Sequence, residues 1–307
     1  MQYVSAVFRR PFYLKSTLEN TMDERPLKAF ADKMMNERNH RGIADFEWYS
    51  PFEMHHILYD PLGEHSPIEL RRVTDAEYEN IPILNQIKLA AKIISRSGEL
   101  KLTPKGNFPL KIVEEIYEKG LVKRDFVEGS GFKIRSEEDV FSINLTRILM
   151  EIAKLTKKRH GKLSLTKSGE KKLSDNHELL RMILLDFMQK FNWAYHDAFP
   201  NESIGRIGCG FSLLLLSKYG AEKRESLFYA EKYFSAFPKL MPVKDNFFGA
   251  EDRRAFRCYA IRTFEHFMEY FGFIAMSRRG KFPFDDMYIV KSDVFNALIH
   301  CKPPGAQ

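Results

Sequence analysis

The sequence predicts a mainly α protein with small β elements, in which an N-terminal helical segment precedes two similar units. Apolar residues recur at helical spacing through most of residues 81–300, and a short β-prone hairpin interrupts them near residues 154–166. A similar order of elements returns in the C-terminal part. We therefore expect three regions, residues 1–80, 81–175 and 176–300.

The composition is that of a globular chain. Its 307 residues are 44% hydrophobic and 13% aromatic, enough for a packed core. No apolar run approaches the ~20 residues of a membrane helix, and the N-terminus lacks the apolar core of a signal peptide. Three widely spaced cysteines without a CxxC argue against a disulfide framework and a zinc site. We expect a cytoplasmic protein with no membrane partner, metal or cofactor.

Two short helices are expected in the acidic, turn-rich residues 1–80. The first runs from Leu27 to Arg38. The second begins at Ser50-Pro51, where a serine N-cap, a proline at the first helical position and Glu53 form an N-terminal signature. Asp60-Pro61 ends it.

Three helices and a short strand are expected next. The first helix ends at Gly98 and carries apolar residues at spacings of 3, 4 and 3, namely Leu84, Ile87, Ala91 and Ile94. An extended run over residues 100–103 and a helix over about residues 107–119 follow. The third helix repeats the apolar spacing with Phe141, Leu145, Ile148, Ile152 and Leu155.

A basic hairpin follows the third helix. His160-Gly161 is a turn signal between two β-prone runs, residues 154–158 and 162–166. Thr166 and Gly169 then lead into another helix. The order helix, strand, helix, helix, hairpin is typical of a winged helix-turn-helix domain.

The amino-acid sequence of this hairpin resembles the wings of MarR- and PadR-type proteins, whose second wing strand ends in the motif LTxxGxxxL. Here the phrase runs from Leu165 to Leu173, and the resemblance covers about residues 84–175. It implies a winged-helix fold and a nucleic-acid-binding role. The loop of about 16 residues before the third helix is longer than the tight turn of such domains. The boxes SPFEM (50–54), IPIL (81–84) and LKLTPKGN (100–107) also resemble uncharacterised bacterial proteins, which supplies no activity.

A second winged-helix-like unit is expected in residues 176–300. Its helices are predicted at residues 179–198, 203–218, 224–236 and about 256–271. A strand, a tip with Gly280 and Pro283, and a second strand follow, and Ser292 caps a closing helix. In this interpretation Tyr288 corresponds to Leu163 of the first hairpin.

The first hairpin is the candidate site. Residues 151–175 hold eight Lys and Arg against three Asp and Glu, which concentrates much of the net charge of +7. Cations at a hairpin tip can contact phosphates, and a cationic stripe on the preceding helix can face base edges. We predict nucleic-acid contacts by Arg147, Lys154, Lys157, Lys158, Arg159 and Lys162. A solvated hairpin that binds nothing gives the same pattern.

The second unit has cations that alternate with acidic residues, namely Arg253, Arg254, Arg257, Arg262, Arg278, Arg279 and Lys281. We interpret them as intramolecular ion pairs at i, i+4 spacings. Of 26 phenylalanines, 17 fall between residues 176 and 300. They supply a core, and an aromatic pocket or a dimer surface stays open as an alternative.

No set of residues carries a recognisable catalytic pattern. His55, His56 and His65 lack metal-ligand spacing, His196-Asp197 has no nucleophile at motif distance, and Gly205 to Gly210 lacks the phosphate-loop pattern. The sequence favours a non-enzymatic binding protein that contacts nucleic acid. The alternative is a protein–protein interaction scaffold whose aromatic half binds a partner or self-associates. An enzyme with no recognisable site is the third possibility.

Overall fold

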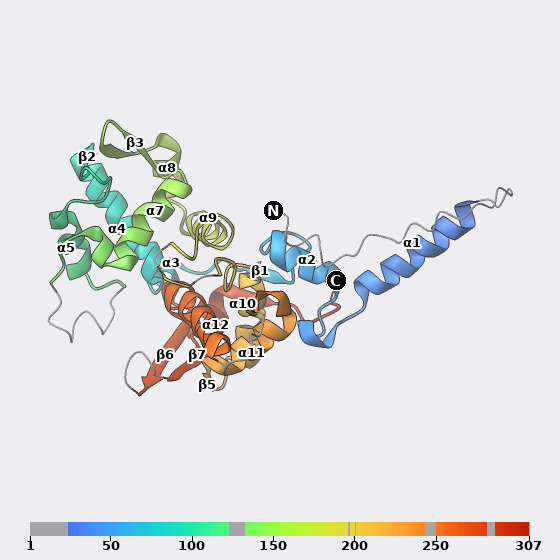
Figure 1. The fold of residues 1–307 in the computed structure, drawn as a ribbon. Helices are drawn as coiled ribbons and strands as arrows, with labels where there is room; N and C mark the ends of the chain where they lie inside the picture. Colours follow the sequence, from blue (N-terminus) through green and yellow to red (C-terminus); the bar gives the residue numbers. More distant parts are fainter. Residues whose placement is uncertain are drawn as a thin grey trace. The chain divides into compact units, whose positions relative to one another are not determined.

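The computed structural model describes residues 24–122, 133–195, 197–199, 201–242, 250–280 and 286–306. The chain divides into two compact units, Met1–Asn39 and His40–Gln307. Helices predominate and the strands form three small antiparallel sheets (Figure 1), so the expected mainly α fold with small β elements is confirmed. Within the described ranges, no helix is both long and apolar enough to cross a membrane.

The described residues of the first unit form one helix, α1 (Glu24–His40). The last residue of this helix, His40, belongs to the second unit. It extends beyond the predicted range of Leu27 to Arg38 at both ends. Its side chains from Lys28 onward are exposed, and they include Phe30, Met34 and Met35. Packing within this unit therefore buries none of them.

The second unit starts with short elements, one of which pairs with its C-terminal strand. They are η1 (Ala44–Phe46), α2 (Pro51–Tyr59), β1 (Ile68–Leu70) and α3 (Asp75–Tyr78). The predicted capping box of α2 is confirmed, because the Ser50 side chain accepts from the Glu53 N–H and the Glu53 carboxylate accepts from the Ser50 N–H. Strand β1 pairs antiparallel with β8 (Ile299–Cys301). Residues 40–80 thus pack with the rest of the chain.

The first block of elements, residues 82–172, shows the predicted order. Its elements are α4 (Pro82–Ser97), β2 (Leu100–Lys101), α5 (Leu110–Glu118), η2 (Glu137–Asp139), α7 (Phe141–Ile152), β3 (Thr156–Arg159), β4 (Lys162–Leu165) and α8 (Lys167–Lys172). The strands form an antiparallel sheet in the order β2-β4-β3. Helix α4 stops where Gly98 adopts a left-handed φ of 64°, as predicted.

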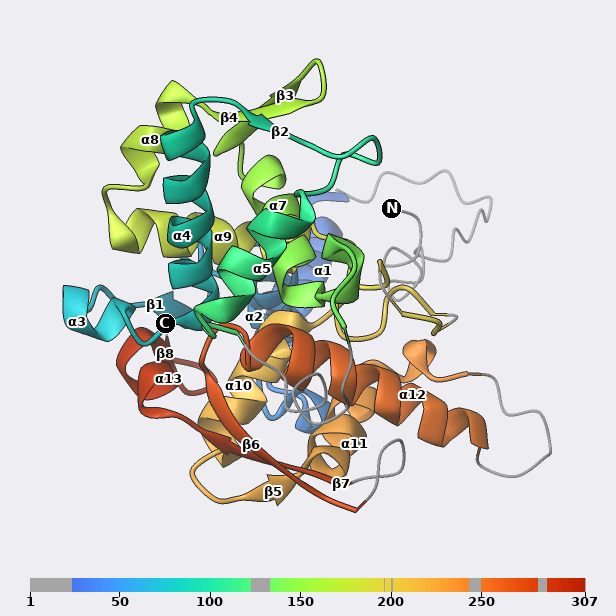
Figure 2. The same ribbon diagram turned by 90° about the vertical axis from the view of Figure 1, so that its left-hand side faces the viewer.

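The second block, residues 209–298, follows the linking helix α9 (Asn176–Gln189). Its elements are α10 (Cys209–Tyr219), β5 (Arg224–Glu225), α11 (Ser226–Ala236), η3 (Pro238–Leu240), α12 (Ala250–Ala260), the π-helical η4 (Ile261–Met268), β6 (Ile274–Arg279), β7 (Asp286–Lys291) and α13 (Asp293–Leu298). The sheet order β5-β7-β6 repeats that of the first block. The two three-stranded sheets lie at opposite ends of the second unit (Figure 2).

The helix boundaries in this half differ from the prediction. Helix α9 ends at Gln189 rather than at residue 198, and α10 begins at Cys209 rather than at residue 203. The described backbone between these helices forms turns. The helix expected over residues 256–271 changes from α to π geometry at Ile261.

The junction between the third helix and the hairpin has the same hydrogen bonds in both blocks. The Thr166 hydroxyl donates to the Lys154 carbonyl (2.8 Å), and the Ser292 hydroxyl donates to the Gly272 carbonyl (2.5 Å). Each hydroxyl also caps the helix that follows. Lys154 and Gly272 both adopt left-handed φ angles, 56° and 71°. Thr166 therefore corresponds to Ser292.

The strand register corrects the predicted correspondence of the two hairpins. Leu163 pairs with Leu100, and Ile289 pairs in the same way with Arg224. Leu163 therefore corresponds to Ile289, and the predicted match of Leu163 with Tyr288 is wrong by one residue. The hairpin tips differ in length, so the register is fixed by pairing with the first strand of each sheet and by the junction hydrogen bonds. A shift of one residue along the strand moves each side chain to the opposite face of the sheet, so it changes which side chains face the core.

We expect the two capping hydroxyls to contribute to stability. We expect Thr166→Val and Ser292→Ala each to lower the free energy of unfolding by about 1 kcal/mol, because each loses an N-cap and a junction hydrogen bond. Urea denaturation measures the effect. Ser168→Ala, at an exposed position of α8, is the control, with an expected change within about 0.5 kcal/mol. Equal effects at all three positions would contradict the assignment.

The phenylalanine-rich half builds the core. Residues 211–216 of α10 are buried on every side, as expected for a central helix. The rings of Phe187, Trp193 and Phe267 pack against one another with centroids 5.0–5.4 Å apart. Among the described residues from 176 onward, the only exposed large apolar side chains are Tyr195 and Leu227. The prediction that most of these aromatic residues form a core is confirmed.

Candidate nucleic-acid interface

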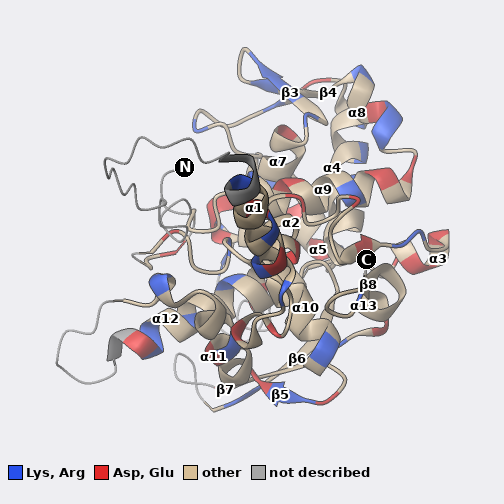
Figure 3. Cartoon of the chain, turned by 90° about the vertical axis from the view of Figure 1, so that its right-hand side faces the viewer, with Lys and Arg blue, Asp and Glu red and all other residues tan. Residues whose placement is uncertain are grey.

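The first hairpin is a short, regular two-stranded element with an exposed tip. His160 and Gly161 connect β3 and β4 with left-handed φ angles of 49° and 71°. Two successive left-handed residues form the tight turn that suits the twist of a two-residue hairpin. The four predicted hairpin residues Lys157, Lys158, Arg159 and Lys162 are all exposed. Basic residues mark β3 and α8 at this end of the first block (Figure 3).

The strand register divides these cations between two faces of the sheet. Lys158 lies directly opposite the fully buried Leu163, on the core-facing side. Its ammonium lies over Gly106, where a Cβ atom would collide with it. Lys157 and Arg159 occupy the alternate positions of β3 and therefore belong to the outer face.

A row of three cations crosses the outer face. Lys101 on β2 pairs with Lys162 on β4, and Lys162 pairs with Arg159 on β3. We call Lys101, Lys162 and Arg159 the cation row. Like charges directly opposite one another on adjacent strands are destabilising. Repulsion within the cation row therefore lowers the stability of the sheet.

One carboxylate partly neutralises the cation row. Glu99 accepts from Lys162 at 2.7 Å, and this hydrogen bond lowers the pKa of Glu99. Both side chains are more than half exposed, so the ion pair is weak and screened by salt. Among the described residues, Lys101 and Arg159 have no ion pair, and neither does the neighbouring Lys157. The outer face keeps an excess of positive charge.

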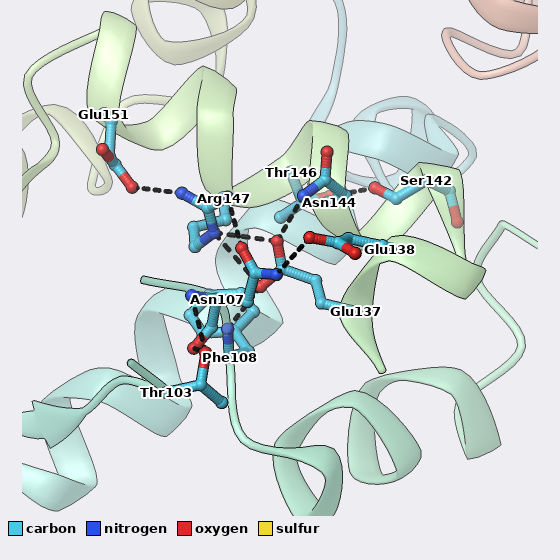
Figure 4. A network of polar contacts seen from close by, with 10 residues as sticks. All are labelled: Thr103, Asn107, Phe108, Glu137, Glu138, Ser142, Asn144, Thr146, Arg147 and Glu151. Carbon is cyan, nitrogen blue, oxygen red and sulfur yellow. Dashed lines mark hydrogen bonds and ion pairs between the residues drawn. The ribbon is translucent and has the colours of Figure 1, made fainter. Parts of the chain in front are cut away.

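Arg147, the predicted site residue on α7, lies inside the protein. It is 8% exposed, and its guanidinium contacts Glu137 at 2.8 Å and Glu151 at 2.6 Å. Figure 4 shows it at the centre of a polar network that also includes Asn107, at 3.3 Å. The predicted stripe of Arg147 and Lys154 is therefore not formed. Lys154 is exposed at the end of α7, whereas Arg147 cannot reach a ligand at the surface.

Glu137 organises this network from a fully buried position. Its carboxylate accepts from the Phe108 N–H, from Asn144 at 2.6 Å and from Arg147. Burial is the largest influence and raises the pKa of Glu137, while these donors lower it in part. The network thereby ties the β2–α5 connection to α7 and fixes where β2 meets the hairpin.

The whole of α7 is enclosed. It packs against α4 and α9, and Gln86 of α4 donates to the Ser142 carbonyl and to Thr146. The ring of Phe141 lies 4.3 Å from that of His266 in the second block. No side chain of α7 is exposed, and its half-buried positions carry Phe141, Ile148, Glu151 and Ile152. A helix with this surface offers no cation to base edges.

The equivalent face of the second block lacks the cation row. By strand register the equivalent positions are Glu225, Tyr288 and Ser277, and the Tyr288 hydroxyl donates to Glu225 at 3.0 Å. Arg262 and Arg278 form intramolecular ion pairs, with Asp197 at 2.6 Å and with Glu265 at 2.8 Å. Neither pair has the predicted i, i+4 spacing, because both partners lie on other segments of the chain. The predicted wing residue Lys281 lies outside the described residues.

The other candidate sites are the histidines near residues 55–65, His196-Asp197 and the glycines before α10. The rings of His55, His56 and His65 lie close together, but in the described part of the chain no three His, Cys, Asp or Glu residues are placed to hold a metal ion. His196 lies outside the described residues. Gly205 and Gly208 adopt left-handed φ angles of 83° and 76° in the turns before α10.

The comparisons with known proteins concern the first block. Residues 79–179 match the Y4jL N-terminal domain family, a stretch that begins just before α4 and ends inside α9. No curated protein and no solved structure matches the chain. The match covers about a third of the chain and assigns no activity to it.

Proposed function

We propose that the chain is a non-enzymatic binding protein with two tandem winged-helix-like blocks, whose first hairpin binds the phosphate backbone of nucleic acid. The element order and the strand orders β2-β4-β3 and β5-β7-β6 support the winged-helix assignment. The shared hydrogen bonds of Thr166 and Ser292 support the repeat. The cation row, with the flanking Lys157, carries the functional part of the proposal.

The cation row is better explained by a ligand than by stability. Three cations side by side repel one another, and a phosphate backbone is the counterion that relieves such repulsion. The second block has the same topology with Glu225, Tyr288 and Ser277 at these positions, so the sheet does not require cations there. The first block therefore has a charge pattern that is suited to binding a polyanion.

The enclosed α7 limits the kind of recognition that we propose. Base edges are read by side chains that enter a groove, and α7 has no exposed side chain to do so. In this proposal the phosphate contacts come from the β2-β4-β3 sheet alone. Binding should therefore depend steeply on salt and little on sequence. We do not propose the scaffold alternative, because the described aromatic half exposes only Tyr195 and Leu227 as large apolar side chains.

Fluorescence anisotropy with a random duplex tests the proposal. The variant Lys101→Ser/Arg159→Ser/Lys162→Ser removes the cation row, and we expect it to bind at least about tenfold more weakly at low salt. The control Lys223→Ser/Lys239→Ser/Arg253→Ser removes three exposed cations of the second block and matches the change in net charge. It should bind within about twofold of the unmodified protein. Equal loss in both variants would indicate a net-charge effect and contradict the assigned face.

A further inference from the structure

A second cluster of cations, on the second block, binds an internal carboxylate. Glu47 lies in the loop after η1, and its side chain is only 11% exposed. It accepts from the ammonium groups of Lys218 and Lys232, each at 2.7 Å, and from the Tyr219 hydroxyl at 2.5 Å. Burial opposes ionisation, but these three hydrogen bonds outweigh it and lower the pKa of Glu47. Two lysines and a tyrosine thus converge on one anion.

Aromatic rings support the cations of this cluster. The Lys232 ammonium lies 4.7 Å from the Tyr219 ring centroid, and the Arg224 guanidinium lies 4.8 Å from that of Phe228. Their side chains are 28% and 34% exposed, so both cations are partly desolvated. Arg224 also meets Glu222 at 2.6 Å, on its more exposed side. Partial desolvation strengthens the attraction between such cations and an anion.

Two buried donors near this cluster lack an acceptor. The Nε atom of Arg224 and the hydroxyl of Tyr229 are buried, and neither has a hydrogen-bond partner among the described residues. Tyr229 is fully buried and its ring packs beside that of Phe228. Buried donors without an acceptor are uncommon in folded proteins and call for an explanation such as a missing ion or ligand. Of these two donors, the Nε–H of Arg224 belongs to the cluster, and Glu47 leaves it without an acceptor.

The segment that supplies Glu47 is held in a strained turn. Glu47 and Trp48 both adopt left-handed φ angles, 55° and 74°, which are unfavourable for residues other than glycine. Hydrogen bonds between Ile43 and the backbone of Trp48 and Tyr49 close the turn on itself. Trp48 is 63% exposed. The contacts of the Glu47 carboxylate offset the strain of the turn.

We infer that Lys218, Tyr219, Arg224 and Lys232 form an oxyanion site that Glu47 occupies as an intramolecular ligand, and that a phosphate group competes with Glu47 for it. A phosphate dianion brings more negative charge and more acceptor oxygens than a carboxylate, so it suits a cluster with an unused donor. This site shares no residue with the cation row. It is an inference independent of the proposed nucleic-acid contact.

The fluorescence of Trp48 reports on the exchange. In a Trp193→Phe background, which leaves Trp48 as the only tryptophan, inorganic phosphate is titrated against chloride at constant ionic strength. We expect a saturable change. Glu47→Gln removes the internal competitor and should lower the midpoint about tenfold, as expected if Glu47 fills the site about nine-tenths of the time. Lys232→Met should abolish the response, and Arg159→Met on the first hairpin should leave it unchanged.

The outcomes separate this site from the first hairpin. A folded Glu47→Gln protein without a saturable phosphate response would overturn the inference, as would a Lys232→Met protein that responds like its parent. If either variant does not fold by circular dichroism, calorimetry of the unmodified protein decides. Absence of saturable phosphate binding at the highest concentration that the protein tolerates would then overturn it. None of these results depends on whether the cation row binds nucleic acid.

Discussion

Replacing Arg147 by methionine should lower the free energy of unfolding by about 3–5 kcal/mol, because it leaves the fully buried Glu137 without its cation. Asn107 and Glu151 also lose a hydrogen-bonding partner. Urea denaturation followed by circular dichroism measures the change. Arg159→Met, an exposed position of the same block, is the matched control and should change stability by less than about 0.5 kcal/mol.

A second replacement distinguishes an ion pair from a general packing effect. The double variant Arg147→Met/Glu137→Leu removes both charges, so it should recover part of the loss of the single variant. A single variant as stable as the control would contradict the account of Glu137 as an ionised group held by Arg147. A double variant less stable than the single would show that the loss is one of packing.

Replacing Arg262 by methionine should have an effect of similar size in the second block, about 3–5 kcal/mol. Arg262 is fully buried, it forms two hydrogen bonds with Asp197, at 2.6 and 2.8 Å, and it donates to the carbonyls of Asn201 and Ile204. Without Arg262, the Asp197 carboxylate, which is only 9% exposed, has no cation beside it. The described turns between α9 and α10 should then lose their main attachment to η4.

Limited proteolysis gives this prediction a local measurement. We expect faster cleavage near Asn201 in the Arg262→Met protein than in an Arg253→Met control, because local opening exposes the backbone to a protease. Arg253 is exposed and lies one helix earlier. Identical cleavage patterns and stabilities in the two variants would contradict the structural role of Arg262.

Local sequence signals predict the elements that they control. The capping residues Ser50 and Glu53 and the helix-ending Gly98 act within one turn of the backbone, so their elements begin or end as predicted. The His160-Gly161 turn likewise fixes the first hairpin. By contrast, α9 ends at Gln189 although the helical spacing of apolar residues continues beyond it. The described residues that follow are held by hydrogen bonds from Arg262, more than 50 residues away in the sequence.

The candidate site could be predicted only in part for the same reason. The exposed cations of the hairpin follow from its composition. The sequence does not indicate Lys101, because this residue joins Lys162 only through strand pairing across some 60 residues. The prediction that Arg147 contacts a ligand is wrong, because the buried Glu137 that binds it lies in a loop before α7 and not on the helix itself. In the sequence, Glu151 at the i, i+4 position is a signal that Arg147 is paired.

The salt dependence of duplex binding tests the central proposal most directly. Each phosphate contact makes the slope of the logarithm of the association constant against the logarithm of salt concentration about 0.9 more negative. If Lys101, Arg159 and Lys162 contact three phosphates, the slope of the unmodified protein should be more negative than that of the triple variant by about 2.7. The matched control from the second block should keep the full slope. Parallel plots for the unmodified protein and the triple variant would contradict the proposal that this face binds nucleic acid.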